Sequence, residues 1–477
     1  MTPPASTGKC AGAGEVEEPL LPEFSGSGHG ASVCGAVFNV STSIIGAGIM
    51  SIPAAMRVLG VLPALLLIAA VAALSDSSVD FMLRYTGWDS GPPSYAGIMG
   101  DAFGRAGAKA LNVCIAFTTT GTLVVYLIII GDVLSGSAGA GDEHAGVLQE
   151  LFGAQWWTAR ELVILVTAVV VLLPLVLRRR VDSLKFTSAV SILLAVVFML
   201  ISLGIAVYAL FTGTTKMPRM LPDFSRLSSP FELFTAVPIV VVAFTFHFNV
   251  HPIRAELSKT SDMKAAVRIS LVLCAAIYAA VGFFGFLLFG DATMADVLAN
   301  FDRSSGAGVP QALNDAARLS YALHLVLVFP LLHFSLRVNV DELLFPGRRP
   351  LGTDTRRFVA LTAVLMAVLY ALASAIPSIW TLFEYSGSTF AVCISLIFPG
   401  AIARHQITTM ASYNSHRLTL GYNCQFVMDA HGIAKKKDKA LAATMIALAV
   451  ITSSIAIASN VMSSISGKVE GGHAAAR

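Results

Sequence analysis

Long apolar runs alternate with short polar segments along the whole chain. A run of about 20 apolar residues crosses the hydrocarbon core of a bilayer as a helix. We count about eleven such runs, which predicts an all-α integral membrane protein. The predicted spans are 33–59, 61–83, 107–131, 162–177, 184–212, 232–253, 266–289, 317–336, 357–376, 378–402 and 440–462.

The first span carries helix-breaking residues in its middle. Its sequence places Gly46-Ala47-Gly48 at mid-length and Pro53 shortly after. Glycine frees the backbone, and proline lacks an N–H donor. An opened backbone inside a membrane is tolerated only where protein buries it or where it lines a cavity. The pattern therefore predicts a broken helix and a binding site at mid-depth.

The sixth span, 232–253, shows a similar interruption, with Asn249, His251 and Pro252 near its end. Two broken spans five positions apart indicate two inverted five-helix halves. We therefore predict a LeuT-type 5+5 inverted repeat with broken helices 1 and 6. The repeats cover approximately 31–212 and 231–402, and an eleventh helix covers approximately 440–462.

Composition and charge support a multi-pass protein and orient it. Only 13% of the 477 residues are charged, and the mean hydropathy is +0.74. Most of the 32 lysines and arginines fall on the side of the N-terminus when the spans alternate, so we expect a cytosolic N-terminus. Residues 1–30 are predicted to be a disordered cytosolic tail, 31–465 a transporter domain, and 466–477 a lumenal or extracellular tail.

Two smaller charge patterns lead to further expectations. Asp76 and Asp80, with Arg84, are expected to form an i,i+4 pair at the cytosolic end of the second span. The tail sequence EEPLLPEF, Glu17 to Phe24, is similar to an acidic dileucine signal for vacuolar or lysosomal membranes. The alternative is a disordered acidic tail that carries no sorting signal.

The sequence favours a transport function over other classes. The six cysteines form no spaced cluster, so neither a disulfide framework nor a metal site is predicted. We find no nucleophile–base–orienter set, so we expect no enzyme and no cofactor. A net charge of +3 gives no indication of nucleic-acid binding. The expected partners are the lipid bilayer and a small substrate, and we expect a monomer.

Five segments resemble the amino acid/auxin permease family, in particular the plant vacuolar amino acid transporters, which are related to the sodium-coupled neutral amino acid transporters. The segments are FNVSTSIIGAGIMSIPAAM (Phe38 to Met56), SYAGIMGDAFGRAG (Ser94 to Gly107), VPIVVVAFTFHFNVHPIRAEL (Val237 to Leu257), FPLLHFSLRVNVDELLFP (Phe329 to Pro346) and IWTLFEYSGSTFAVCISLIFPGAI (Ile379 to Ile402).

This resemblance implies a secondary active transporter of amino acids, expected to be neutral ones. The substrate carboxylate would meet the free N–H groups beyond the first break, and the opened carbonyls of the sixth span suit the ammonium. The expected substrate-binding residues are Thr42, Ser43, Gly46, Ala47, Gly48, Phe244 and His247. For Thr42 and Ser43 the alternative is hydrogen bonding within their own helix, and for His247 it is packing.

The driving ion is expected to be the proton. In the sodium-coupled branch a hydroxyl residue of span eight helps to hold sodium, and Val326 and Val328 stand at the matching positions here. His324 and Glu384 are the candidate coupling residues, although Glu384 at the membrane interface facing water is an alternative. The alternative functions are a sodium-coupled amino acid symporter and a non-transporting amino acid sensor. We expect a vacuolar or other endomembrane location, with the plasma membrane as alternative.

Overall fold

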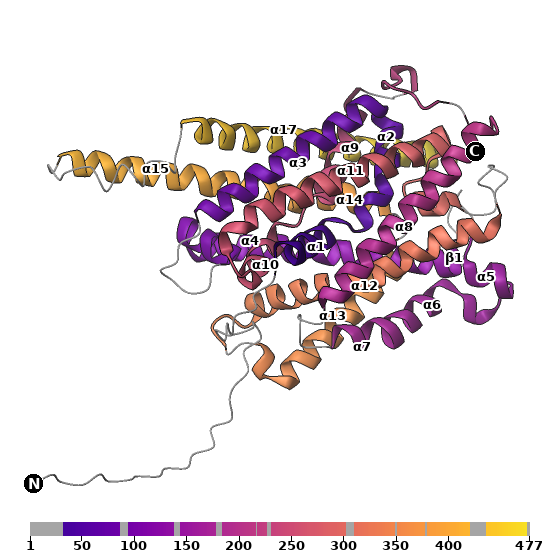
Figure 1. The fold of residues 1–477 in the computed structure, drawn as a ribbon, viewed down its shortest axis with the longest axis horizontal. Coiled ribbons are helices and arrows are strands. Elements are labelled where there is room, and N and C mark those ends of the chain that lie inside the picture. The colour runs from indigo at the N-terminus through magenta and orange to yellow at the C-terminus, as the bar shows by residue number, and fades with distance from the viewer. Residues whose placement is uncertain are drawn as a thin grey trace, which may run out of the picture.

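The computed structural model describes residues 32–85, 94–137, 144–177, 184–215, 217–226, 230–301, 310–348, 351–376, 379–419 and 436–474. The tail predicted over 1–30 lies outside the described residues. The helices are α1 (Val33–Ile44), α2 (Ile52–Leu59), α3 (Val61–Arg84), α4 (Tyr95–Ser135), α5 (Val147–Phe152), α6 (Arg160–Val166), α7 (Leu173–Val176), α8 (Leu184–Phe211), α9 (Ala236–Ala243), α10 (Val250–Glu256), α11 (Met263–Phe289), α12 (Gln311–Leu344), α13 (Thr355–Ala375), α14 (Ile379–Ser386), α15 (Phe398–Thr419) and α17 (Lys436–Ala474) (Figure 1).

The described residues confirm an all-helical membrane protein. They contain nine helices that are long and apolar enough to span a bilayer, and a bent pair, Val33–Ile44 with Ala47–Leu59, adds a tenth. The span predicted over 162–177 consists of α6, a π-helical stretch at Thr167–Leu172, and α7 in direct succession. A two-residue pairing of β1 (Gly136–Ser137) with β2 (His144–Ala145) lies between α4 and α5.

Several predicted boundaries were wrong. The span predicted over 378–402 ends too early, because α15 continues to Thr419. The last helix is longer than its apolar core, since α17 runs from Lys436 to Ala474 and enters the predicted tail. Both extensions are polar, and the hydrophobic pattern therefore missed them.

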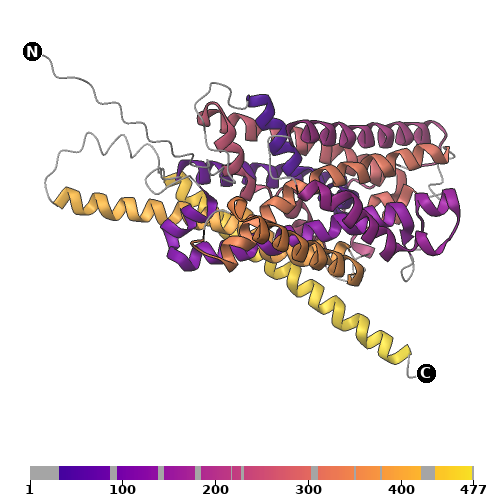
Figure 2. The same ribbon diagram turned by 90° about the horizontal axis from the view of Figure 1, so that it is seen from below.

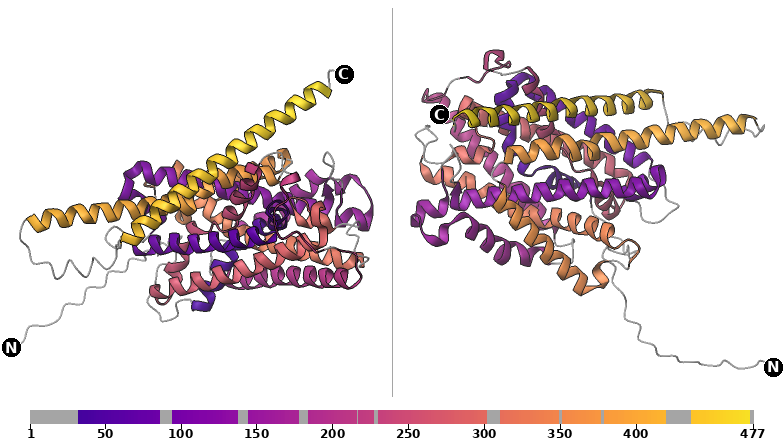
Figure 3. Two further views of the ribbon diagram at one scale, coloured as in Figure 1. Left: turned by 90° about the horizontal axis from the view of Figure 1, so that it is seen from above. Right: turned by 180° about the vertical axis from the view of Figure 1, so that it is seen from behind.

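The long helices form a bundle around α1 and α9. The helix α12 packs against α4 and α8, while α11 packs against α1, α2 and α3. In Figures 2 and 3, α15 extends beyond one end of the bundle, and α17 crosses its outer face toward the C-terminus. This arrangement leaves the interrupted helices enclosed by their neighbours.

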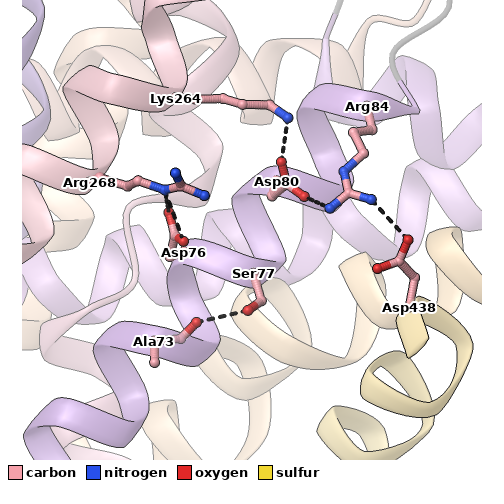
Figure 4. Close-up of polar contacts among 8 residues, drawn as sticks. All are labelled: Ala73, Asp76, Ser77, Asp80, Arg84, Lys264, Arg268 and Asp438. Carbon is pink, nitrogen blue, oxygen red and sulfur yellow. Dashed lines mark hydrogen bonds and ion pairs between the residues drawn. The ribbon is translucent and has the colours of Figure 1, made fainter. Parts of the chain in front are cut away.

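Ion pairs join three helices at the end of the bundle that is predicted to face the cytosol (Figure 4). Arg84 pairs with Asp80 one turn earlier, as expected, and also with Asp438 of α17 at 2.9 Å. Lys264 of α11 reaches Asp80 with a 2.5 Å Nζ–Oδ1 distance. Asp80 thus holds α3 and α11 together, and Arg84 attaches α17 to α3.

We expect Asp80→Asn to lower the stability of the bundle. The Asp80 side chain is only 12% exposed and contacts two cations, which would be left facing each other. The loss should be about 1 kcal/mol or slightly more, because pairs near a surface contribute roughly that much. The midpoint of thermal unfolding in detergent measures it. Asp76→Asn is the control, since Asp76 is 33% exposed and its one ion pair among the described residues is with Arg268 at 3.3 Å; an equal shift in both variants would contradict the prediction.

Candidate substrate site at two interrupted helices

The first interruption follows directly from the local sequence. The helix α1 ends at Ile44, and Ile45 and Gly46 are extended, with φ and ψ of −73° and 108° and of −152° and −158°. A 3₁₀ turn, Ala47–Ser51, then leads into α2, where Pro53 occupies the first turn. Proline is well suited to that position because first-turn N–H groups have no helical acceptor. The predicted break of the first span is therefore present.

The second interruption lies opposite the first. The helix α9 ends at Ala243, a 3₁₀ turn covers His247–Asn249, and α10 begins at Val250. A Cβ atom added to Gly48 would lie 2.8 Å from the Cβ and 2.9 Å from the Cα of Ala243. Only glycine allows the two broken helices to approach this closely. The backbone of one break therefore packs against the end of the helix that precedes the other.

Two tyrosines satisfy the carbonyl groups that the breaks expose. The Tyr278 hydroxyl, from α11, lies 2.6 Å from the carbonyl oxygen of Ile44 and 2.9 Å from that of Ala243. The Tyr321 hydroxyl, from α12, donates to the carbonyl oxygen of Gly46 at 2.7 Å. In a membrane an unpaired carbonyl costs several kcal/mol. Tyr278 therefore ties the ends of both interrupted helices, and the sequence reasoning missed it.

Glycine at position 46 also makes room for a third tyrosine. A Cβ atom added there would overlap the hydroxyl oxygen of Tyr126, from α4. Tyr126 is fully buried. The space beside Gly46, which was expected to admit substrate, is thus occupied by this side chain in the present conformation.

The two predicted hydroxyl residues of α1 make different contacts. Thr42 donates to the carbonyl oxygen of Ser188 in α8 at 3.3 Å. Ser43 donates to the carbonyl oxygen of Asn39 in its own helix at 2.9 Å and accepts from the Asn249 amide at 3.2 Å. The Asn249 oxygen in turn accepts from Ser335 of α12 at 2.8 Å. Ser43 thus belongs to a polar link between both breaks and α12.

The side chains predicted at the second break are buried. Phe244 packs edge-on against Tyr278, with ring centroids 5.1 Å apart. His247 is fully buried, and neither of its ring nitrogens has a hydrogen-bond partner among the residues that the structure describes. A buried polar group without a partner is costly, so a ligand or water that bonded to this ring would stabilise it.

The candidate coupling residues lie in separate helices. His324 of α12 is buried, with Nδ1 2.6 Å from the carbonyl oxygen of Ser191 in α8. A carbonyl oxygen only accepts, so Nδ1 carries the proton in this contact. Glu384 of α14 is also buried, and its carbonyl oxygen accepts from Ser388 at 2.6 Å. His324 stands one turn from Tyr321 and hence close to the first break.

No group of three His, Cys, Asp or Glu side chains is placed to hold a metal ion in the described part of the chain. On α12, Val328 is buried and Val326 packs against the core. Aliphatic side chains offer no oxygen to a hard cation. At the first break, residues 47 to 50 have backbone carbonyl oxygens but no side-chain oxygen that could bind a cation.

Comparisons with known proteins identify the family of the chain. Residues 29–428 match the family described as "Transmembrane amino acid transporter protein". The chain is 49% identical to "Amino acid transporter AVT6C" of Arabidopsis thaliana over 94% of this chain and 98% of the relative. It is 26% identical to "Sodium-coupled neutral amino acid transporter 7" of Danio rerio, over 82% and 85%. A manganese transporter of Eremococcus coleocola superposes with a TM-score of 0.48 at 12% identity, over 90% and 86%.

The fold and the enclosed breaks define a multi-pass membrane protein of transporter type. The chain belongs to the transmembrane amino acid transporter family, and the resemblance noted from its motifs is confirmed. It is a transporter by family and not an enzyme, as expected, and a free amino acid is the implied substrate.

We expect Tyr278→Phe to reduce transport strongly while the protein stays folded. The hydroxyl has one proton, which the two carbonyl oxygens share, and its removal leaves buried acceptors unpaired at a cost of about 1–3 kcal/mol, so the arrangement of the breaks should weaken by about tenfold. Amino acid uptake by purified protein in liposomes measures the effect. Tyr85→Phe is the control, because the buried Tyr85 hydroxyl has no hydrogen-bond partner among the described residues. Full activity of Tyr278→Phe would show that the tie is dispensable.

Proposed function

We propose that this chain is a secondary active transporter of free amino acids, neutral ones in particular, that works by alternating access. The observation that carries the proposal is the meeting of two interrupted helices inside the bundle, with Tyr278 bonded to the last carbonyl of α1 and of α9. Broken helices in corresponding positions of two repeats form the substrate sites of such carriers. We also propose that the helices form a LeuT-type 5+5 inverted repeat with one additional helix.

In this proposal the substrate binds between the breaks. The N–H groups at Gly46 to Gly48 would receive the carboxylate, since they precede α2 and carry the positive end of its dipole. Carbonyl oxygens near Phe244 would accept from the ammonium. His247, whose ring lacks a partner among the described residues, would bond to the substrate directly or through water. Thr42 and Ser43 would complete the site.

The packing of the helices supports a division into two moving groups. The helix α11 packs against α1, α2 and α3, and α12 packs against α4 and α8; α8 also packs against α1 and α11 and so lies at the border between the two groups. Few direct hydrogen bonds link the groups near the breaks, among them Thr42 to Ser188 and Tyr321 to Gly46. Rocking of one group against the other would expose the site to each side in turn.

We propose proton coupling, with His324 and Glu384 as candidate groups. The carbonyl oxygens of Ile44 and Gly46 already accept from tyrosine hydroxyls, which leaves them weaker ligands for sodium. The alternative is sodium coupling, which the name of the Danio rerio relative favours. We further propose a monomer with a cytosolic N-terminus in a vacuolar or other endomembrane; the sorting motif behind this location lies outside the described residues.

The driving ion can be determined in proteoliposomes. Uptake of radiolabelled neutral amino acids should follow an imposed pH gradient and should stay at background under a sodium gradient alone. Uptake that requires sodium would refute proton coupling. Saturable binding without uptake under either gradient would refute transport itself and would favour a sensor.

We expect Gly46→Val to reduce uptake by about tenfold or more, because overpacking a filled site typically costs about 1–3 kcal/mol. The added side chain would overlap the Tyr126 hydroxyl, so that either Tyr126 or the break would have to shift. Gly204→Val is the control, since a Cβ atom at Gly204 of α8 meets no atom within 4 Å. Both variants should reach the membrane in equal amounts on a blot. Normal uptake by Gly46→Val would rule out a substrate site at this glycine.

A further inference from the structure

The segment that joins α11 to α12 covers the first interruption. We call residues 290–301 the cover segment; it contains the 3₁₀ turns Gly290–Ala292 and Val297–Phe301. Ser51, at the end of the broken stretch, donates to the carbonyl oxygen of Ala295 at 2.8 Å. The rings of Phe301 and Phe198 of α8 lie 6.0 Å apart. The cover segment therefore contacts both groups of helices at the end that is predicted to face away from the cytosol.

Asp296 is the buried acid of the cover segment. The residue is 9% exposed, and its Oδ1 accepts from the Leu298 N–H at 2.9 Å. Capping aspartates usually face water, because an ionised carboxylate is costly to bury without a cation. Asp296 forms no ion pair with any residue that the structure describes. Its position therefore suits a carboxyl group that binds a proton.

The charged groups near Asp296 are already paired with other residues. Asp132 of α4 and Arg318 and Tyr321 of α12 lie near it, and Ala47–Ser51, which also packs against the cover segment, has no titratable side chain. Asp132 is paired with Arg160 at 2.6 Å, and the buried Arg318 is paired with Glu150 at 3.1 Å. Both arginines thus have carboxylate partners, and a charge on Asp296 would be in excess.

Burial is the main cause that raises the pKa of Asp296 from 3.8 to about 7, with a smaller contribution from Asp132. If the cover segment opened to water, the pKa would return toward its ordinary value. The closed form then binds the proton more tightly than the open form. Closure is accordingly favoured as the pH falls below about 7 and is weakened as the pH rises through that value.

We infer that Asp296 is a proton-binding residue of the transport cycle, whose protonation closes the cover segment over the first interruption. Tyr321 connects the two places, since its ring contacts Phe198, which contacts Phe301 of the cover segment, and its hydroxyl donates to the carbonyl oxygen of Gly46. The role in transport rests on the proposed function, whereas the pH-dependent closure can be tested without it. A purely structural role, in which Asp296 only caps the 3₁₀ turn at Val297–Phe301, is the alternative.

Asp296→Asn separates these two roles. Asparagine caps a helix as well as aspartate, so the bond to the Leu298 N–H is kept, but it cannot ionise. Asp291→Asn is the matched control, because Asp291 lies in the same segment, is half exposed and is paired with Arg219. Hydrogen–deuterium exchange of the full-length protein in nanodiscs, corrected for intrinsic rates, reports opening at residues 294–301.

We expect the wild-type protein and Asp291→Asn to be about tenfold better protected in this segment at pH 6 than at pH 8. Asp296→Asn should be equally protected at both pH values, and its uptake should lose its dependence on pH between them. A wild-type segment with the same protection at both values, or an unchanged pH dependence in Asp296→Asn, would overturn the inference. Failure of proton-driven uptake with pH-dependent protection intact would instead refute the proposed function alone.

Discussion

The structure depends on how backbone groups are satisfied where two helices are interrupted inside a membrane protein. Each break frees carbonyl groups that water cannot reach, and an unpaired carbonyl in that setting is costly. The carbonyl oxygens of Ile44 and Ala243 share the one proton of the Tyr278 hydroxyl, and the Tyr321 hydroxyl donates to the carbonyl oxygen of Gly46. The close contact of Gly48 with Ala243 brings the two breaks near enough for this to work.

Polar contacts around this centre extend to both ends of the bundle. On one side, Ser43, Asn249 and Ser335 link the breaks to α12. At the other end of the bundle, Ser51 donates to the carbonyl oxygen of Ala295 in the cover segment, and Tyr321 lies near Asp296. The substrate residues proposed from the sequence lie between these links. A change in the cover segment can thus reach the breaks through only a few hydrogen bonds.

Local chemistry explains which features were predictable from the sequence. Gly46, Gly48 and Pro53 act on their own backbone, so the first break could be located from residue types alone. Tyr278 bonds to carbonyl groups far away in the chain, and Asp296 is buried in a segment that packs against α4 and α12; an apolar helix or a short loop gives no sign of such contacts. The polar part of α15 was missed because a hydrophobic run shows which part of a helix lies inside the bilayer and does not show where the helix ends.

The fit of Gly48 against Ala243 also bears on how the protein can move. Surfaces in contact at backbone level cannot slide past one another without separating, because no flexible side chain lies between them. The one Tyr278 hydroxyl, which the carbonyl oxygens of Ile44 and Ala243 share, also holds the ends of α1 and α9 together. In the proposed transport cycle these two ends would therefore move together, and the change would occur at their borders with α8 and α12.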